Sequence, residues 1–300
     1  MKITITQKLK PIFEETLISE GHTVYGTEDA QASNAELYIG YAENKIQQEN
    51  FPNLKYIQLA SAGYDNLDLE KLKNKKVQVA NAKGVYSEAI AEYVLTYILY
   101  ALKDIKYLEK LQETKTWDKS QIKPKTLMHQ NVFLLGTGSI SQEVAKRLKA
   151  FSAKLTGFNS NGRSIEHFDE TYPLSELKER IKEAEIIVAA LPDNESTNHL
   201  ITKEMIQLVQ EDAIFINVGR GGLVDEKSIQ GHTKHLRKII LDVFETEPLP
   251  TDSYLWTESN VITTPHMSFY ASQNDANLVK LVLENINNIE KQKSLTNQIL

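Results

Sequence analysis

The sequence predicts an α/β protein in which a domain with a doubly wound parallel sheet is inserted into a second, smaller α/β domain. Short apolar runs alternate with amphipathic stretches along the 300 residues, as expected of parallel strands joined by crossover helices. The strand-like runs form two groups, one within residues 1–100 and one that begins at Asn131, which predicts two separate sheets. The length and the 41% content of hydrophobic residues are sufficient for two cores.

The first domain carries its own alternation of strands and helices. Strands are predicted at Lys2–Thr6, Ala35–Gly40, Leu54–Leu59 and Val77–Ala80, and helices at Lys10–Glu20 and Asn274–Lys291. A long helix at Ser87–Leu111 is predicted between the two groups of strands, where we expect it to be buried between the domains. We expect the last helix to return to the first domain. That domain is therefore predicted to be discontinuous, with residues 1–100 plus 270–300 around a small flavodoxin-like sheet, and the second domain to span residues 101–269.

Six strands are predicted for the second domain. They begin at Val132–Leu135 and continue at Lys154–Phe158, Ala184–Leu191, Ala213–Val218, Lys238–Val243 and Asn260–Thr263. Helical stretches such as Leu174–Ala184 and Lys203–Val209 separate several of them. Strands joined by such crossovers form a doubly wound sheet, and a ligand crevice is expected at the carboxyl ends of its strands.

A glycine turn follows the first strand of this domain. Gly136 and Gly138 allow the chain to turn tightly, and the amphipathic helix begins directly after them. A helix N-terminus behind such a turn binds anions through its free N–H groups. The pattern is G-x-G-x-x-S, with Ser141 where a glycine or alanine is usual, and serine is small enough for close packing of helix on strand. The segment is therefore predicted to be a Rossmann-type dinucleotide-binding unit, with a plain strand–helix corner as the alternative.

The composition excludes several other classes. A net charge of −6 without a basic tract argues against a nucleic-acid-binding protein. Without cysteines, the chain has neither disulfides nor thiol catalysis nor cysteine metal sites, and we predict no metal site. The N-terminus resembles no signal peptide, and no apolar stretch is long enough to span a membrane, so a cytoplasmic location is expected.

The residues after the second strand of the larger sheet point to the cofactor. An NAD-selective fold places Asp or Glu there to bind the ribose hydroxyls. Asn159 occupies that position, and no acid follows until Glu166. The missing charge removes repulsion against a 2′-phosphate, Ser160 can donate to that phosphate, and Arg163 can supply a charge-assisted contact. An ordinary surface turn is the alternative, but the missing acid favours NADP(H) over NAD(H).

Three further strand ends carry groups suited to catalysis. Arg220 lies among glycines just past one strand, where a guanidinium can fork onto a carboxylate. Several acids follow the next strand, from Asp242 to Glu247, in a proline-stiffened loop. His266 follows the last strand, and a neighbouring carboxylate would fix its tautomer. Each has a structural alternative, such as a surface ion pair or a solvated turn, but consecutive strand ends beside a nucleotide unit favour a shared site.

These motifs resemble one family. NVGRGGLVDE, LDVFETEP and TPHMS occur in order after the G-x-G-x-x-S unit, and QLASAGYDNLD and NAKGVYSEAIAEYVL precede it. Over nearly its full length the chain is similar to the D-isomer-specific 2-hydroxyacid dehydrogenases, in particular to glyoxylate/hydroxypyruvate reductase-like 2-ketoacid reductases. The resemblance implies two α/β domains with the active site between them.

The resemblance also implies residue roles. His266 matches the acid/base that protonates the keto oxygen, Glu247 its carboxylate partner, and Arg220 the arginine that binds the substrate carboxylate. The substrate loop of the first domain matches Ala62, Gly63 and Tyr64. The cofactor-binding positions of the family match Gly136, Gly138, Ser139, Ile140, Thr197 and Asp242, with Asp242 near the nicotinamide. We add to the predicted cofactor site Asn159, Ser160, Arg163, Leu191, Pro192, Val218 and Gly219.

The function predicted from these matches is NADPH-dependent reduction of a small 2-keto acid to the D-2-hydroxy acid by a homodimer. A phosphoglycerate dehydrogenase-like enzyme would need cations for a phosphate, for which the first domain offers Lys45 and Lys83. A D-lactate dehydrogenase-like enzyme is a further alternative. A dinucleotide-sensing, corepressor-like binding protein is an alternative of another class.

Overall fold

The computed structural model describes residues 1–42 and 51–300, which form two compact units. Unit 1 consists of Met1–Tyr86 and Ala271–Leu300, and unit 2 of Ser87–Tyr270. Unit 2 is thus inserted into the chain of unit 1. Residues 87–100, which the sequence assigned to the first domain, lie in unit 2 because helix α4 packs there against helix α6.

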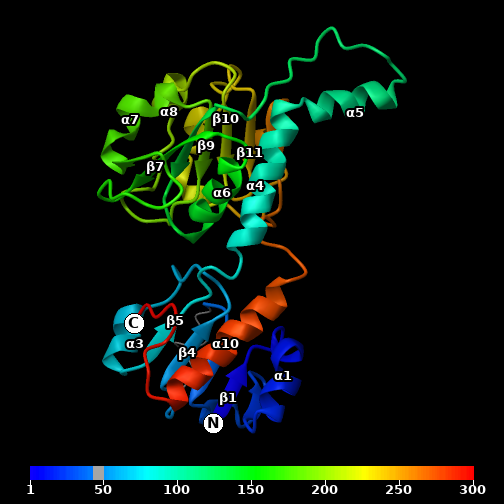
Figure 1. The fold of residues 1–300 in the computed structure, drawn as a ribbon. Coiled ribbons are helices and arrows are strands. Elements are labelled where there is room, and N and C mark those ends of the chain that lie inside the picture. Colours follow the sequence, from blue (N-terminus) through cyan, green and yellow to red (C-terminus); the bar gives the residue numbers. More distant parts are fainter. Residues whose placement is uncertain (43–50) are drawn as a thin grey trace. The chain divides into compact units, whose positions relative to one another are not determined.

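Unit 1 contains, in its described residues, a five-stranded sheet whose strands are all parallel (Figure 1). The strands are β1 (Lys2–Ile5), β2 (Thr23–Gly26), β3 (Leu37–Gly40), β4 (Tyr56–Leu59) and β5 (Gln78–Ala80). Its helices are α1 (Lys10–Ser19), α3 (Leu69–Asn74) and α10 (Asn274–Glu290), with a 3₁₀ turn, η1 (Ala32–Asn34). The order β2-β1-β3-β4-β5 is the flavodoxin-like order, so the predicted architecture is confirmed.

The two faces of this sheet have separate cores. Ile3 and Ile39 face α1 and α10, whereas Tyr38 and Ile57 face the side of α3. Strand β2 was not predicted, because an edge strand that exposes Thr23 lacks the continuous apolar run of a buried strand. Lys45, one of the two candidate phosphate-binding lysines, lies outside the described residues.

Unit 2, which is described throughout, contains a seven-stranded parallel sheet in the order β12-β11-β10-β9-β6-β7-β8. The strands are β6 (Asn131–Leu135), β7 (Lys154–Asn159), β8 (Glu170–Pro173), β9 (Ile186–Ala189), β10 (Ile214–Asn217), β11 (Lys238–Leu241) and β12 (Val261–Thr263). The chain runs outward from β6 to β8 and then continues on the other side with β9, which is the doubly wound order predicted. Strand β8 was missed because it is a partly exposed edge strand without an apolar run.

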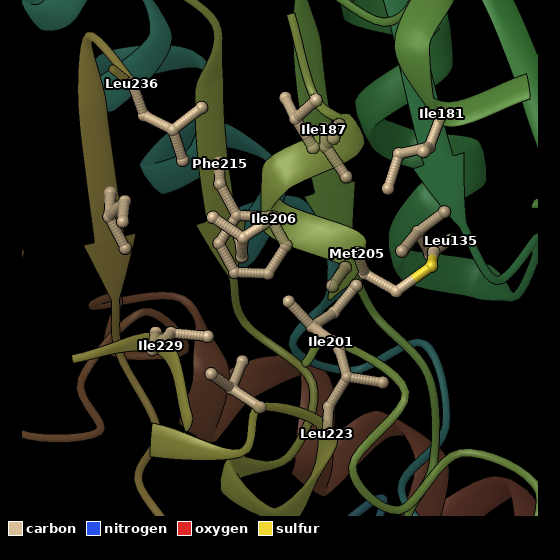
Figure 2. Packing of buried hydrophobic residues seen from close by; sticks show 14 of the residues in the cluster. Leu135, Ile181, Ile187, Ile201, Met205, Ile206, Phe215, Leu223, Ile229 and Leu236 are labelled. Carbon is tan, nitrogen blue, oxygen red and sulfur yellow. The ribbon is translucent and has the colours of Figure 1, made fainter. Parts of the chain in front are cut away.

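The helices of unit 2 are α4 (Ser87–Leu102), α5 (Ile105–Glu113), α6 (Ser139–Lys149), α7 (Leu177–Arg180), α8 (Lys203–Leu208) and α9 (Glu226–Ile229), with 3₁₀ turns η2 (Leu174–Glu176), η3 (Ile181–Glu183), η4 (Gly221–Leu223) and η5 (Tyr254–Trp256). All of the α-helices except α5 bury side chains in the unit. Figure 2 shows Met205 and Ile206 of α8 beside Phe215 in the hydrophobic core of unit 2. Among the described residues, no helix is long and apolar enough to cross a membrane.

The single helix predicted over 87–111 is wrong, because the chain breaks it between α4 and α5. Asp104 has a left-handed backbone (φ 52°), and its carboxylate accepts the N–H of Lys123 at 3.0 Å and pairs with Arg237 at 2.9 Å. Arg237 also donates to the carbonyls of Ala101 and Lys123. One buried guanidinium therefore ties together both ends of residues 103–126, which we call the arm.

Candidate active site

The strand ends of unit 2 bring most of the sequence-predicted residues to one edge of the sheet. Because all seven strands are parallel, the loops after β6, β7, β9, β10, β11 and β12 leave the sheet at the same edge. The winding direction changes between β6 and β9, where a doubly wound sheet opens its ligand crevice. At this point a Cβ on Gly136 would lie 2.9 Å from the carbonyl oxygen of Ala190, so the two loops touch.

The glycine turn has the shape that a dinucleotide requires. Gly136 has φ 91°, which favours glycine, and α6 begins at Ser139 with Gly138 as its N-cap. Apart from Gly138 itself and its two neighbours in the chain, no heavy atom of the described residues lies within 4 Å of the position that a Cβ on Gly138 would take, so a ligand can approach the bare backbone there. Ser141 is buried, as its small size predicted. The residues therefore fit a pyrophosphate at the start of α6.

The loop after β7 uses Asn159 to hold its own shape. The Asn159 amide donates to the carbonyl of Arg163 at 2.9 Å, and its oxygen accepts the N–H of Asn161 at 3.2 Å. Ser160 and Arg163 are exposed at the surface of this loop. The position that carries the ribose-binding acid in NAD-selective folds is therefore occupied by a buried, neutral side chain that shapes the loop.

Thr197 has a similar role in the loop after β9. Its hydroxyl donates to the carbonyl of Pro192 at 2.7 Å and accepts the N–H of Asn194 at 3.0 Å. His199, at the end of the same loop, contacts Glu245 through Nε2 at 2.6 Å. His199 was not predicted as a site residue, because its contact with Glu245 spans 46 residues and leaves no local pattern in the sequence.

Arg220 sits on a loop that two close backbone contacts hold in place. Buried Asn217 donates its amide to the carbonyl of Arg220 at 2.9 Å and accepts the N–H of Gly219 at 3.1 Å. A Cβ on Gly221 would lie 1.9 Å from the carbonyl group of Phe244, so only glycine fits there. Leu191 and Val218 are buried beside these turns. The Arg220 side chain itself is partly exposed, as needed for a ligand-binding guanidinium.

His266 and Glu247 form a pair. The Nδ1 atom of His266 lies 2.7 Å from Oε2 of Glu247, while Oε1 of the same carboxylate accepts the N–H of Phe244 at 3.0 Å. His266 is partly exposed and has a left-handed backbone (φ 47°), and the ring of Phe269 meets the imidazole edge-on with centroids 5.9 Å apart. With Nδ1 engaged by the carboxylate, Nε2 is the nitrogen that can exchange a proton with a substrate.

Asp242 is fully buried and holds the loop that carries His266. Its carboxylate accepts the Thr264 hydroxyl at 2.6 Å and the N–H groups of Met267 and Ser268 at 2.8 and 2.9 Å. The Asp242 backbone carbonyl accepts the N–H of His266 at 2.9 Å. The carboxylate that was predicted to be part of the cofactor site is thus engaged by residues on both sides of His266.

The predicted substrate loop lies in unit 1, after β4. The carbonyl of Ala62 accepts the Asn81 amide at 2.8 Å, and the carbonyl of Gly63 accepts the Ser61 hydroxyl at 2.8 Å. Because these carbonyls are engaged, the loop has a defined shape. Tyr64 is exposed.

Comparisons with known proteins agree with this architecture. A sequence model of the "D-isomer specific 2-hydroxyacid dehydrogenase, NAD binding domain" matches residues 95–268. Hydroxypyruvate reductase of Thermotoga maritima is 35% identical over 72% of this chain and 71% of its own length. Glyoxylate/hydroxypyruvate reductase B of Enterobacter sp. (strain 638) is 30% identical over 95% of this chain and 88% of its own. D-3-phosphoglycerate dehydrogenase of Methanocaldococcus jannaschii is 34% identical, but the match spans only 42% of that longer protein.

Solved structures give the same result. A D-isomer specific 2-hydroxyacid dehydrogenase family protein from Aeromonas salmonicida superposes with a TM-score of 0.85 at 26% identity and covers 100% of this chain and 98% of its own. The corresponding protein from Xanthobacter autotrophicus Py2, in complex with NADPH and MES, gives a TM-score of 0.85 at 25% identity with the same coverage. The protein therefore belongs to the D-isomer-specific 2-hydroxyacid dehydrogenase family and is an oxidoreductase with a nicotinamide dinucleotide cofactor.

Proposed function

We propose that the protein reduces a small 2-keto acid to the D-2-hydroxy acid with NADPH, and that His266 supplies the proton. The observation that carries this proposal is the contact between His266 Nδ1 and Glu247 Oε2, at the sheet edge where the glycine turn opens. A histidine held by a carboxylate at one nitrogen is a suitable proton donor at the other. The names of the T. maritima and Enterobacter relatives support glyoxylate and hydroxypyruvate as substrates.

Three side chains of the site have different roles in this proposed reduction. The reduced nicotinamide, when bound, would supply the hydride for the carbonyl carbon. His266 Nε2 transfers a proton to the carbonyl oxygen as that oxygen gains negative charge, and Glu247 stabilises the protonated imidazole before transfer. Arg220 binds the substrate carboxylate and polarises the carbonyl.

The test is a panel of reductions followed by the loss of absorbance of the reduced cofactor. Glyoxylate, hydroxypyruvate, pyruvate and phenylpyruvate are each combined with NADPH and with NADH, and the product of hydroxypyruvate is analysed for its configuration. We expect turnover of glyoxylate or hydroxypyruvate, a preference for NADPH, and D-glycerate as product. Binding of NADPH without turnover of any keto acid would instead favour a sensor.

A phosphoglycerate dehydrogenase-like activity is the second candidate, favoured by the 34% identity to the M. jannaschii enzyme. Of the two lysines that were predicted as phosphate ligands, Lys83 lies in the part of the chain that the structure describes, and it is exposed. The same panel with 3-phosphohydroxypyruvate separates the candidates. A kcat/KM for the phosphorylated acid well above that for hydroxypyruvate would replace the first proposal.

The preference for NADPH rests on the loop after β7. Asn159 brings no charge there, the exposed Ser160 and Arg163 are available to a 2′-phosphate, and the X. autotrophicus relative was solved with NADPH. Arg163→Ala should weaken NADPH binding by about 1–3 kcal/mol and leave NADH binding nearly unchanged. Cofactor fluorescence titrations measure both constants. Lys182→Ala, which removes an exposed charge of the same sign before β9, is the matched control. Equal losses for both cofactors in Arg163→Ala would exclude a phosphate contact.

The arm supports the further proposal of a homodimer. Every side chain of α5 is at least partly exposed, and Trp117, beyond α5, is fully exposed. Figure 1 shows α5 and the segment after it projecting from the sheet of unit 2. Exposed apolar residues on a segment that Arg237 fastens at both ends are typical of a protein–protein interface.

The double variant Leu108→Asp/Trp117→Asp should convert a dimer into a monomer. Light scattering during gel filtration is expected to give twice the chain mass of 34.1 kDa for the wild type and the single mass for the variant. Leu208→Asp, at an equally exposed leucine of α8, should remain dimeric. A wild type that elutes as a monomer at micromolar concentration would refute this proposal.

A further inference from the structure

A line of hydroxyl groups connects helix α4 to the buried carboxylate of Asp242. The Tyr93 hydroxyl lies 2.6 Å from the Thr264 hydroxyl, which in turn lies 2.6 Å from Oδ1 of Asp242. Tyr93 and Thr264 are 171 residues apart in sequence. Tyr93 belongs to α4, which was predicted only as a helix. The motif NAKGVYSEAIAEYVL, which carries part of the family resemblance, includes Tyr93, but no role at the site was predicted for it.

The direction of this line follows from counting protons. A threonine hydroxyl has one hydrogen, and here it is donated to the Asp242 carboxylate. The Thr264 oxygen can therefore only accept from Tyr93, so the tyrosine is the donor in this pair. The Tyr93 side chain is also hydrogen-bonded to the Tyr97 side chain. Burial raises the pKa of Tyr93 well above its ordinary value, which keeps this hydroxyl protonated. The Tyr97 ring packs against the Tyr93 ring with centroids 4.6 Å apart and supports its position.

The other end of the line determines where His266 stands. Among the described residues, the Asp242 carboxylate accepts hydrogen bonds from the Thr264 hydroxyl and from the N–H groups of Met267 and Ser268, which are all uncharged donors. These donors lie on both sides of His266 in the sequence. A rotation of the carboxylate away from any of them would shift the histidine relative to Glu247. Because Asp242 is fully buried, water does not replace a lost donor, and each of the three bonds is costly to lose.

We propose that Tyr93 is a positioning residue for the proton donor, acting through Thr264 and Asp242 to hold the 264–268 loop in the orientation that pairs His266 with Glu247. This inference rests on the proposed reductase function, since it assigns Tyr93 to the same site. It predicts an effect on the chemical step and not on cofactor binding. Tyr93 and Thr264 act as neutral hydrogen-bond donors, so the proposal involves no change in the charge of either side chain.

The test compares Tyr93→Phe with Tyr100→Phe. Both remove one hydroxyl from α4, but the Tyr100 hydroxyl bonds to Glu109 at 3.1 Å, away from the loop. Tyr93→Phe should lower kcat about fivefold, the size expected of one buried hydrogen bond, with KM and the dissociation constant of NADPH within about twofold of wild type. Tyr100→Phe should leave all of these constants unchanged.

A double-mutant cycle examines whether the effect passes through Thr264. In a Thr264→Ser background, which keeps the hydroxyl, Tyr93→Phe should lower kcat as it does in the wild type. In a Thr264→Val background it should have no further effect, because the line is already broken. Equal losses from Tyr93→Phe in all backgrounds would overturn the proposal.

A readout without turnover separates this inference from the proposed function. Hydrogen exchange of the peptide spanning 264–270 reports the Met267 and Ser268 amides that bind Asp242. Exchange should be faster in Tyr93→Phe than in the wild type and unchanged in Tyr100→Phe. If the wild type reduced none of the keto acids, the function would fail while this comparison still decided the role of Tyr93. Wild-type exchange rates in Tyr93→Phe would refute that role.

Discussion

Replacement of His266 by alanine is expected to lower kcat for keto-acid reduction by about 10³-fold, within the range that one general acid contributes. The variant loses the nitrogen that protonates the carbonyl oxygen. It keeps the glycine turn after β6, the β7 loop and the Asp242 network, so the NADPH dissociation constant should stay within about twofold of the wild type. Single-turnover reduction and a fluorescence titration measure the two quantities. A kcat near that of the wild type would remove His266 from the mechanism.

Glu247→Gln is expected to affect the same proton donor as His266→Ala, but to a smaller extent. The carboxylate lies 2.7 Å from His266 Nδ1 and stabilises the protonated, proton-donating imidazole. A neutral amide cannot balance the positive charge of the proton-donating imidazole. The kcat for reduction should therefore fall, by less than in His266→Ala, while the dissociation constant of NADPH stays within about twofold of the wild type. A kcat equal to that of the wild type would show that the charge of Glu247 does not support the proton donor.

Arg220→Ala should lower kcat/KM for glyoxylate roughly a hundredfold, because two charge-assisted hydrogen bonds to the substrate carboxylate are lost. This corresponds to a loss of about 3 kcal/mol of transition-state stabilisation. Most of the loss is expected in KM, since a carboxylate is bound in the ground state as well as in the transition state. Arg220→Lys keeps the charge but not the fork and should recover only part of the loss. Steady-state kinetics at saturating cofactor gives both constants.

The control for Arg220 uses the neighbouring loop. Asn217 accepts the N–H of Gly219 and donates to the carbonyl of Arg220, so Asn217→Ala disturbs the loop without removing the guanidinium. An equal loss of kcat/KM in Arg220→Ala and Asn217→Ala would indicate that loop geometry, and not the positive charge, supports substrate binding. An unchanged KM in Arg220→Ala would exclude a contact with the carboxylate.

Much of the fold could be predicted because local sequence patterns indicated its strands and turns. The buried strands of the larger sheet, such as β6 and β10, are continuous apolar runs, and the turn at Gly136 is marked by its glycines. The strands that were missed, β2 and β8, are edge strands without such a run. The break at Asp104 escaped prediction because its cause is Arg237, which is far away in the sequence.

The candidate site divides in the same way. The sequence predicted that Arg220, Glu247 and His266 follow strands, and parallel strands bring their carboxyl ends to one edge of the sheet. It did not predict that the side chains of Asn159 and Thr197 point inward and shape their own loops. Neither was the pairing of His199 with Glu245.

By itself, the sequence determined the α/β class, the two sheets, the glycine turn and the chemical groups that follow the strands. These depend on periodicity and on residue type, which a single chain displays directly. Only the tertiary structure decided that Asp242 points inward to hold the His266 loop and that Tyr93 reaches it through Thr264. The reason is physical: a hydrogen bond depends on the direction of two side chains, and between residues distant in sequence that direction arises only when the helices and strands pack.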